Sequence, residues 1–366
     1  SKMIFWSSFI VLFSYALLIL VLYIGALKSR RKKNSLEKNR ISVVIPFRNE
    51  GDRLDPLLAS IMNANESSGF VEFIFVDDHS QDFSKNLIKG TLNDKVDFSV
   101  FENAERGKKA ALTLGISKAK FDNILTLDAD VYFEKDYLAT LIHLDLSADC
   151  TILPVRLISA KNNVLQHLDV LEFKSLQLAT FGMAGLGVPI LANGANFLFK
   201  KKAFQLVNGY TGNENVSSGD DLFLLNKFNQ EPSLKVNSLQ HEKVMVSTLT
   251  VATFSAFIDQ RIRWSAKTMA MKSIPSYIVS GIIVSVNFLV YVWLLKLIFS
   301  IDHVSYLGLL MLKLGLDYAL VVHRYKTYEL GKSLYYIPLL SIAYPIYLCL
   351  LIPASFIRKP LWKGRK

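Results

Sequence analysis

Cysteine is scarce in this chain, which has only two among its 366 residues. Cys150 and Cys349 do not have the close spacing of a zinc site, and they indicate no disulfide framework. The sequence also lacks a G-x-G-x-x-G motif after its first apolar strand, which argues against a dinucleotide-dependent dehydrogenase. The scarcity of cysteine fits a catalytic domain that folds in the reducing cytoplasm.

Acidic residues are outnumbered by basic ones, 31 to 42, and the formal net charge is +11. A basic excess sometimes indicates nucleic-acid binding, but the chain has neither a recognition motif nor a basic–aromatic repeat. We therefore expect no nucleic-acid partner. Hydrophobic residues make up 51% of the chain, which is high for a soluble enzyme and indicates membrane segments.

Charge is absent from residues 4–27, a run long enough to cross a hydrocarbon core of about 30 Å. Because it is longer than a signal peptide's apolar part and has no small-residue cleavage site, we expect an uncleaved anchor. A basic cluster follows at residues 28–33. The positive-inside rule then places this cluster and the catalytic domain in the cytoplasm. Together with the apolar C-terminal segments, the anchor predicts a multi-pass protein of the plasma (inner) membrane, with the basic cluster in contact with the lipid bilayer.

The C-terminal third is also apolar. Residues 277–299 and 334–357 are long enough to span, and residues 304–322 are a further candidate despite Lys313 and Asp317, which could pair on one helix face. Three crossings would place the basic tail outside, against the positive-inside rule, so a re-entrant last segment with a cytoplasmic tail is the preferred alternative.

Between these ends, short β-rich runs at residues 41–45, 71–76, 96–101 and 123–127 alternate with helix-compatible stretches. This pattern predicts an α/β fold with a mainly parallel sheet and helices on both faces. The predicted domains are an anchor with its basic flank, a catalytic domain, an interfacial amphipathic helix and C-terminal membrane or re-entrant segments with a basic tail. Their bounds are 1–33, 34–250, 251–275 and 276–366.

Polar residues follow the predicted strands, where ligands bind in parallel sheets. Asp128-Ala129-Asp130 ends the fourth strand, and such carboxylates suit Mg²⁺ or Mn²⁺ on a diphosphate, although Asp is also common in turns. Asp78 follows the second strand and could bind a nucleoside or cap a helix. Lys108 stands at a helix start, where a phosphate partner and a solvated turn are both open.

Two further groups precede or lie within predicted helices. Asp220 and Asp221 open a helix, where Asp221 could serve as a general base or as an ordinary cap. Gln260, Arg263 and Trp264 bring an amide, a cation and a flat ring to one side of a helix. That set suits a diphosphate and a sugar better than a protein core.

From Ile41 to Trp264 the chain resembles the membrane-bound family 2 glycosyltransferases of the GT-A fold. These include cellulose, chitin, hyaluronan and poly-N-acetylglucosamine synthases and ceramide glucosyltransferases. The motifs that carry the resemblance are residues 42–50, residues 76–80, the D-x-D, the Asp before the helix, and Q-x-x-R-W. The chain departs from the family in having Asp220 where Glu is frequent, and in lacking a large pore-forming region.

The resemblance implies a role for each motif residue. Asp221 would be the general base, and Asp130 would hold a divalent metal, Mg²⁺ or Mn²⁺. Arg263, also catalytic, would offset with the metal the charge that builds on the leaving nucleoside diphosphate. Together with Lys108, the residues expected to bind the nucleotide sugar are Pro46, Arg48, Glu50, Asp78, Asp128, Gln260 and Trp264.

The expected reaction is an inverting, metal-dependent transfer of a sugar from a nucleotide sugar, by resemblance a uridine diphosphate sugar, to a hydroxyl of a membrane-associated lipid acceptor. A processive polysaccharide synthase acting on a glycan acceptor is the first alternative. A non-catalytic, membrane-anchored sugar-nucleotide-binding protein is the second.

Overall fold

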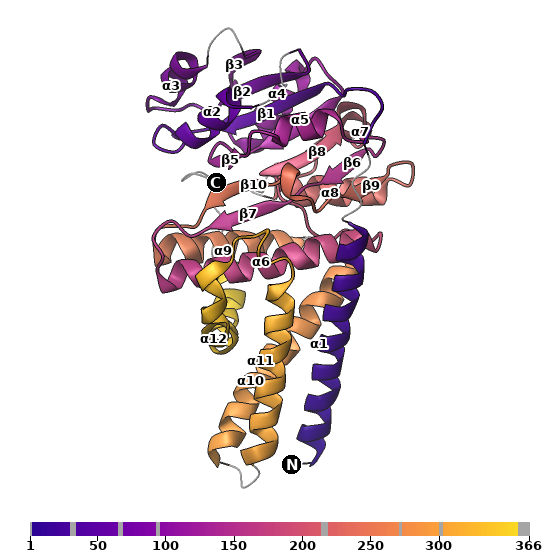
Figure 1. The fold of residues 1–366 in the computed structure, drawn as a ribbon, viewed down its shortest axis with the longest axis vertical. Helices are drawn as coiled ribbons and strands as arrows, with labels where there is room; N and C mark the ends of the chain where they lie inside the picture. The colour runs from indigo at the N-terminus through magenta and orange to yellow at the C-terminus, as the bar shows by residue number, and fades with distance from the viewer. Residues whose placement is uncertain are drawn as a thin grey trace. The chain divides into compact units, whose positions relative to one another are not determined.

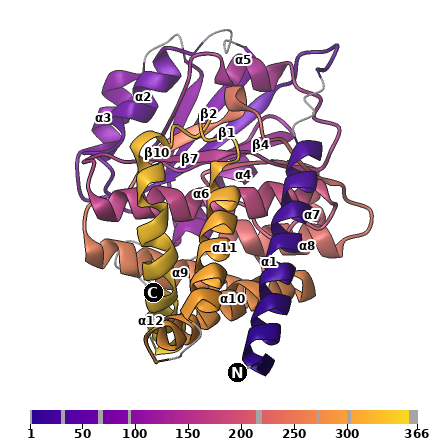
Figure 2. The same cartoon turned by 60° about the horizontal axis from the view of Figure 1, so that its bottom comes forward.

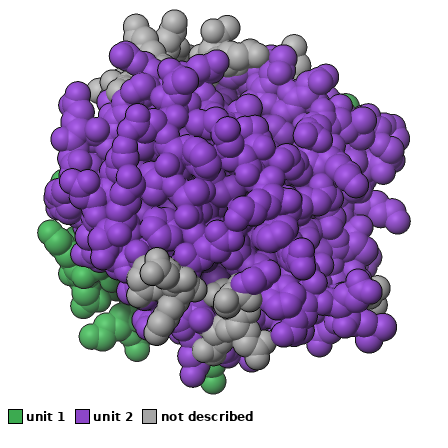
Figure 3. Space-filling model, turned by 90° about the horizontal axis from the view of Figure 1, so that it is seen from above, with its two compact units in different colours: residues 1–26, 157–183, 250–359 green, residues 27–156, 184–249, 360–366 purple. Residues whose placement is uncertain are grey.

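The computed structural model of the chain describes residues 2–29, 34–64, 69–92, 96–213, 219–270, 273–299 and 303–357. The described chain forms two compact units, coloured separately in Figure 3. Unit 1 comprises residues 1–26, 157–183 and 250–359, and unit 2 comprises residues 27–156, 184–249 and 360–366. Residues 157–183 therefore group with the chain's two ends, although they lie within the range 34–250 that the sequence assigns to one domain.

Unit 2 is built on a seven-stranded sheet in the order β3-β2-β1-β4-β8-β6-β9 (Figure 1). Neighbouring strands are parallel from β3 to β4, whereas β8 is antiparallel to both β4 and β6. The mixed, mainly parallel sheet predicted from sequence is thus confirmed. Its strands are β1 (Ile41–Phe47), β2 (Val71–Asp77), β3 (Phe98–Glu102), β4 (Asn123–Leu127), β6 (Cys150–Ile152), β8 (Asn196–Lys200) and β9 (Val236–Ser238).

The first strand is longer than its sequence pattern suggests, because β1 continues through Pro46 instead of stopping before it. Proline lacks the N–H that a strand with two neighbours needs. Here β4 pairs only with residues 41–44 of β1, so Pro46 has β2 as its one neighbour. The strand therefore tolerates proline and delivers Arg48 to its carboxyl end.

Helices pack around this sheet, and α4 lies directly on it. A Cβ on Gly115 of α4 would come within 2.4 Å of Val44 on β1, so only glycine allows this close packing.

A smaller sheet has the order β5-β10-β7. The remaining elements of this part of the chain are α2 (Asp55–Met62), α3 (Ser84–Thr91), α4 (Lys108–Lys118), β5 (Val131–Phe133), α5 (Tyr137–Ile142), β7 (Val155–Ile158), α7 (Lys201–Leu206), α8 (Asp220–Gln230), η1 (Glu242–Val244) and β10 (Val246–Leu249).

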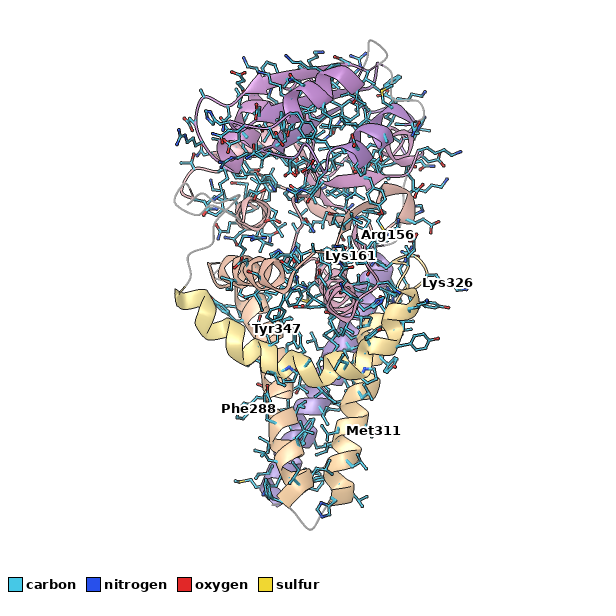
Figure 4. All side chains as sticks on the ribbon, turned by 90° about the vertical axis from the view of Figure 1, so that its left-hand side faces the viewer. Arg156, Lys161, Phe288, Met311, Lys326 and Tyr347 are labelled. Carbon is cyan, nitrogen blue, oxygen red and sulfur yellow. The ribbon has the colours of Figure 1, made fainter. Side chains whose placement is uncertain are left out.

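Unit 1 is helical. Figures 1 and 2 show α1, α10 and α11 side by side, and an apolar core that includes Leu12, Trp293 and Tyr306 joins them. On the outside of these helices, Phe288 and Met311 point away from the bundle (Figure 4) and are mostly exposed. The helices are α1 (Lys2–Lys28), α6 (Val164–Gly185), α9 (Phe254–Ala270), α10 (Ile274–Phe299), α11 (His303–Val322), η2 (Gly331–Tyr336) and α12 (Ile337–Ile357).

Among the described residues, three helices are long and apolar enough to cross a membrane, namely Met3–Lys28, Ile274–Phe299 and His303–Val322. Candidate membrane helices near both ends of the chain were expected from sequence. The basic residues 30–33, residues 271–272 and the basic tail 358–366 lie outside the described residues.

One polar cluster lies inside this helical unit. Lys313 and Asp317 form an ion pair of 2.5 Å within α11, as their spacing suggested. Asp317 also accepts hydrogen bonds from Tyr15 of α1, at 2.9 Å, and from the hydroxyl of Ser341 of α12. Burial of a charged pair is tolerated when polar partners surround it, so this cluster connects three helices.

Candidate active site

The predicted nucleotide-binding residues of unit 2 follow the carboxyl ends of adjacent strands. Arg48 and Glu50 follow β1, Asp78 follows β2, and Asp128 and Asp130 follow β4. The strand order reverses at β1, since β2 and β3 lie on one side of it and β4 lies on the other. In open α/β sheets the crevice at such a reversal is where ligands bind.

The loops after β1 and β2 are fastened to each other by reciprocal hydrogen bonds. The Asn49 N–H donates to the Ser80 hydroxyl oxygen at 3.0 Å, and the Gln81 N–H donates to the Asn49 amide oxygen at 2.8 Å. Asn49 has a φ of +50°, a left-handed conformation that asparagine adopts more readily than most residues. Ser80 therefore joins two loops and does not cap α3, which begins at Ser84.

Asp78 is completely buried and organises the next loop. Its Oδ1 accepts hydrogen bonds from the Gly107 N–H at 2.8 Å and from the Asn103 side-chain amide at 3.0 Å. Gly107, with a φ of +106°, immediately precedes α4. Asp78 thus fixes the turn that positions Lys108, a contribution that the motif alone did not reveal.

Lys108 links two carboxylates that are far apart in sequence. Its ammonium lies 2.8 Å from Asp128 Oδ1 and 3.3 Å from Asp220 Oδ2. Burial by itself lowers the pKa of Lys108, but the charges of Asp128 and Asp220 outweigh it and hold the pKa well above its ordinary value. Lys108 is therefore positively charged at neutral pH, at the junction of the D-x-D and the start of α8.

Asp221 lies in the first turn of α8 and is held by two backbone donors. Its Oδ2 accepts from the Gly194 N–H at 3.1 Å, and its Oδ1 accepts from the Leu222 N–H at 2.8 Å. Gly194 fits tightly here, because a Cβ at this position would stand 3.0 Å from Asp220 Oδ2 and 3.5 Å from Lys108 Nζ. The segment before β8 is thus bonded to the acidic start of α8 and passes close to Lys108.

Arg53 is a site residue that sequence reasoning missed. Its guanidinium lies 2.6 Å from Glu50 Oε2 and 3.7 Å from Asp130 Oδ2, so it connects the loop after β1 to the D-x-D. Its place three residues after Glu50 fits an i,i+3 contact, but no local pattern indicates the contact with Asp130. The two cations Arg53 and Lys108 each contact one carboxylate of the D-x-D.

The carboxylates suit a metal that takes few ligands from the protein. Among the described residues there is no group of three or more His, Cys, Asp or Glu side chains placed to hold a metal ion. Asp130 is 38% exposed and Asp128 is 35% exposed, so both are accessible to solvent. Mg²⁺ is commonly bound by one or two carboxylates, with water and substrate phosphates completing its shell. The donor set fits that mode of binding.

In unit 1, the residues of Q-x-x-R-W lie on α9, and the guanidinium that is fully buried among them is that of Arg261. Its guanidinium contacts Glu172 at 2.8 Å and Asp169 at 2.5 Å, both on α6. It also donates to the Gln260 side-chain oxygen at 2.5 Å and lies 4.5 Å from the Trp264 ring. Two members of the motif are therefore arranged around Arg261.

Arg263, the arginine of the motif, is only half-buried. Burial lowers its pKa, and the charge of Asp259 partly opposes this effect. Its environment is therefore distinct from that of Arg261, although both arginines lie on the same helix.

Comparisons with known proteins identify the type of domain in which these residues lie. Residues 42–206 match Glycosyl transferase family 2. The chain is 34% identical over 96 residues to an undecaprenyl-phosphate 4-deoxy-4-formamido-L-arabinose transferase of Proteus mirabilis, and 36% identical over 101 residues to one of Aeromonas hydrophila. These alignments cover 25% and 27% of this chain and 29% and 31% of the relatives, so the chain spans less than a third of their length.

Among solved structures, a mannosyltransferase from Pyrobaculum calidifontis, in complex with GDP-Man and Mn²⁺, aligns over 95% of this chain and 97% of its own. The TM-score is 0.58 and the sequence identity is 14%, which shows a shared fold. The chain therefore carries a glycosyltransferase family 2 domain, and its fold is of the GT-A type.

Proposed function

We propose that the protein transfers a sugar from a nucleotide sugar, by resemblance a uridine diphosphate sugar, to a lipid acceptor at the membrane. The family 2 domain supports sugar transfer. The three apolar helices and the relatives named for undecaprenyl phosphate support an acceptor in the bilayer. The charge on residues 28–33 supports a cytoplasmic catalytic unit in the plasma (inner) membrane.

The observation that carries this proposal is the position of Lys108 between Asp128 and Asp220. A diphosphate leaving group gains negative charge as the glycosidic bond breaks, and a fixed cation at the carboxyl edge of the sheet stabilises that charge. The same cation lies beside the acidic start of α8. Donor and acceptor chemistry would thus share one electrostatic centre.

A divalent metal would be held by Asp130, with Asp128 close by. When bound, Mg²⁺ or Mn²⁺ supplies Lewis-acid stabilisation of the diphosphate oxygens. The chain's own residues would do the rest of the binding. Arg48, Glu50, Asp78 and the end of β1 at Pro46 would surround the nucleoside, and Gln260, Arg263 and Trp264 of α9 would contribute to donor binding and transfer.

The proposed step is an inverting displacement. The acceptor oxygen forms a bond to the anomeric carbon while the bond from that carbon to the diphosphate breaks. For a hydroxyl acceptor, Asp221 would take the proton. A lipid phosphate is the second candidate acceptor, and the names of the relatives favour it. It is also favoured by the backbone N–H groups that already donate hydrogen bonds to both Asp221 oxygens. A phosphate oxygen is already ionised and needs no base.

Membranes containing the full chain, incubated with a panel of labelled nucleotide sugars, test the proposal. One sugar on a chloroform-soluble product is the expected result. A high-mass polymer would instead establish the processive synthase, and nucleotide-sugar binding without any product would establish the non-catalytic binding protein. Mild acid distinguishes the two lipid acceptors, because a glycosyl phosphate is labile to it and an alkyl glycoside is stable.

A further inference from the structure

The segment between α11 and α12, residues 323–336, lies at a defined end of the helical unit. Tyr23, near the end of α1, donates a hydrogen bond to the Ala319 carbonyl, and its ring lies 4.7 Å from the ring of His323. Because α10 packs along α11 and only residues 300–302 separate them, the start of α10 lies at this end as well. All three candidate membrane helices therefore have one terminus at the end where this segment lies.

The segment is fixed onto α6 by specific contacts. His167 Nδ1 lies 2.8 Å from the Ser333 hydroxyl oxygen, and the His167 ring stacks on Tyr336 at 4.6 Å. About two turns further along α6, the Lys174 ammonium lies 4.8 Å from the centre of the Tyr328 ring. These contacts occupy one side of the segment and hold its backbone in place.

Other side chains of the segment are exposed, and they are basic or aromatic. Tyr335 is 81% exposed and Tyr325 is 39% exposed. Lys326 and Lys332 are exposed as well, and Figure 4 shows Lys326 pointing away from the ribbon. With Arg324 and a single acidic residue, Glu329, the segment has a net positive charge.

We propose that residues 323–336 form a binding surface for the headgroups of anionic phospholipids. Tyrosines favour the interface between water and lipid, where the ring is partly apolar and the hydroxyl is hydrated. Lysines close to an anionic surface are attracted electrostatically to its headgroups. The position of the segment at the shared end of three apolar helices places these side chains where headgroups are found, and the contacts with α6 limit the ordering needed on binding.

Lipid binding by the full chain tests this surface. The protein is reconstituted into nanodiscs of phosphatidylcholine with a minority of phosphatidylglycerol, transferred to detergent, and the retained lipids are quantified. Phosphatidylglycerol should be enriched over its share in the nanodisc. In the double variant Lys326→Gln/Lys332→Gln most of this enrichment should be lost, so that the retained lipids approach the composition of the nanodisc.

Two matched variants make the result specific. Lys326→Arg/Lys332→Arg keeps both charges and should retain the enrichment. Lys89→Gln/Lys235→Gln removes two exposed charges from unit 2 and should also retain it. Unchanged enrichment in the Lys326→Gln/Lys332→Gln protein, or an equal fall in the unit 2 control, would overturn the proposal. The readout is lipid binding, so it stands independently of sugar transfer.

Discussion

The ammonium of Lys108 lies 2.8 Å from Oδ1 of Asp128, and the two residues come from different strand ends of one sheet. Lys108 begins α4 after β3, whereas Asp128 follows β4. The same ammonium reaches Asp220 at 3.3 Å. One cation therefore offsets two carboxylates that would otherwise repel each other and any incoming diphosphate.

Substitution of Lys108 by methionine should weaken binding of a nucleoside diphosphate by roughly tenfold or more, because the carboxylates are left without their shared cation. Calorimetric titration in the presence of Mn²⁺ measures this. Lys118→Met, at the other end of α4, is the control and should bind normally. An unchanged affinity in the Lys108 variant would remove this residue from the donor site.

A methyl group at position 194 should disturb the same centre from another direction. In Gly194→Ala the new Cβ would stand 3.0 Å from Asp220 Oδ2, so the carboxylate must shift by a few tenths of an ångström. Transfer should fall several-fold, as small misplacements at reacting groups do. Gly90→Ala, where nothing lies within 4 Å, is the matched control and should leave activity unchanged. Equal activity of the two variants would contradict the tight fit.

Much of this arrangement could be predicted from sequence, because strand-end chemistry is local. The β-rich runs at 41–45 and 123–127 correspond to β1 and β4, and the polar residues that follow them lie at the predicted edge. Asp128 and Asp130 belong to a motif whose spacing is visible in the chain. For β1 and β4, the strands expected from the local sequence pattern are the strands that the folded sheet contains.

The contacts that join separate loops could not be predicted. Neither Arg53 with Asp130 nor Gly194 with Asp221 has a local signal, since each contact joins segments that are far apart in the sequence. The helix α6 was also missed, because residues 164–185 show no simple amphipathic pattern. Its burial on several sides explains why one apolar face did not stand out.

The two arginines of α9 should respond differently to removal. Arg261→Met leaves Asp169 and Glu172 buried without their cation, so the variant should be destabilised by about 3–5 kcal/mol. Arg263→Met removes the half-buried arginine of the same helix, so this variant should unfold near the wild-type temperature but transfer sugar more slowly. Thermal unfolding and transfer rate, measured on both variants, separate the roles. A stable Arg261→Met protein would contradict the ion network as a structural anchor.

Acidification should loosen the contact between α6 and η2. Burial lowers the pKa of His167 from its ordinary value of 6.5, and the charge of Lys332 adds to this. The contribution of neutral His167 to the free energy of unfolding is therefore fully present above about pH 6.5, and it declines as the pH falls from there through the lowered pKa of the folded state. The unfolding temperature at pH 5.5 relative to pH 7.5 should drop less in His167→Gln than in wild type. Equal drops would exclude His167 as the titrating group.

Asp221 separates catalysis from binding. If it is the general base for a hydroxyl acceptor, Asp221→Asn keeps the shape of the side chain but removes the proton acceptor. Transfer should then fall by roughly 10²-fold or more, while metal-dependent binding of the nucleoside diphosphate stays nearly unchanged. Asp130→Asn, at the proposed metal position, should instead weaken metal-dependent binding first.

The structure adds a reason to perform this experiment on both acceptor types. The Gly194 and Leu222 N–H groups already hold both Asp221 oxygens, which suits a carboxylate that stabilises the first turn of α8 as well as one that accepts a proton. An Asp221→Asn enzyme with a normal transfer rate would end the base assignment. It would favour a lipid phosphate acceptor, whose attacking oxygen carries no proton to be removed.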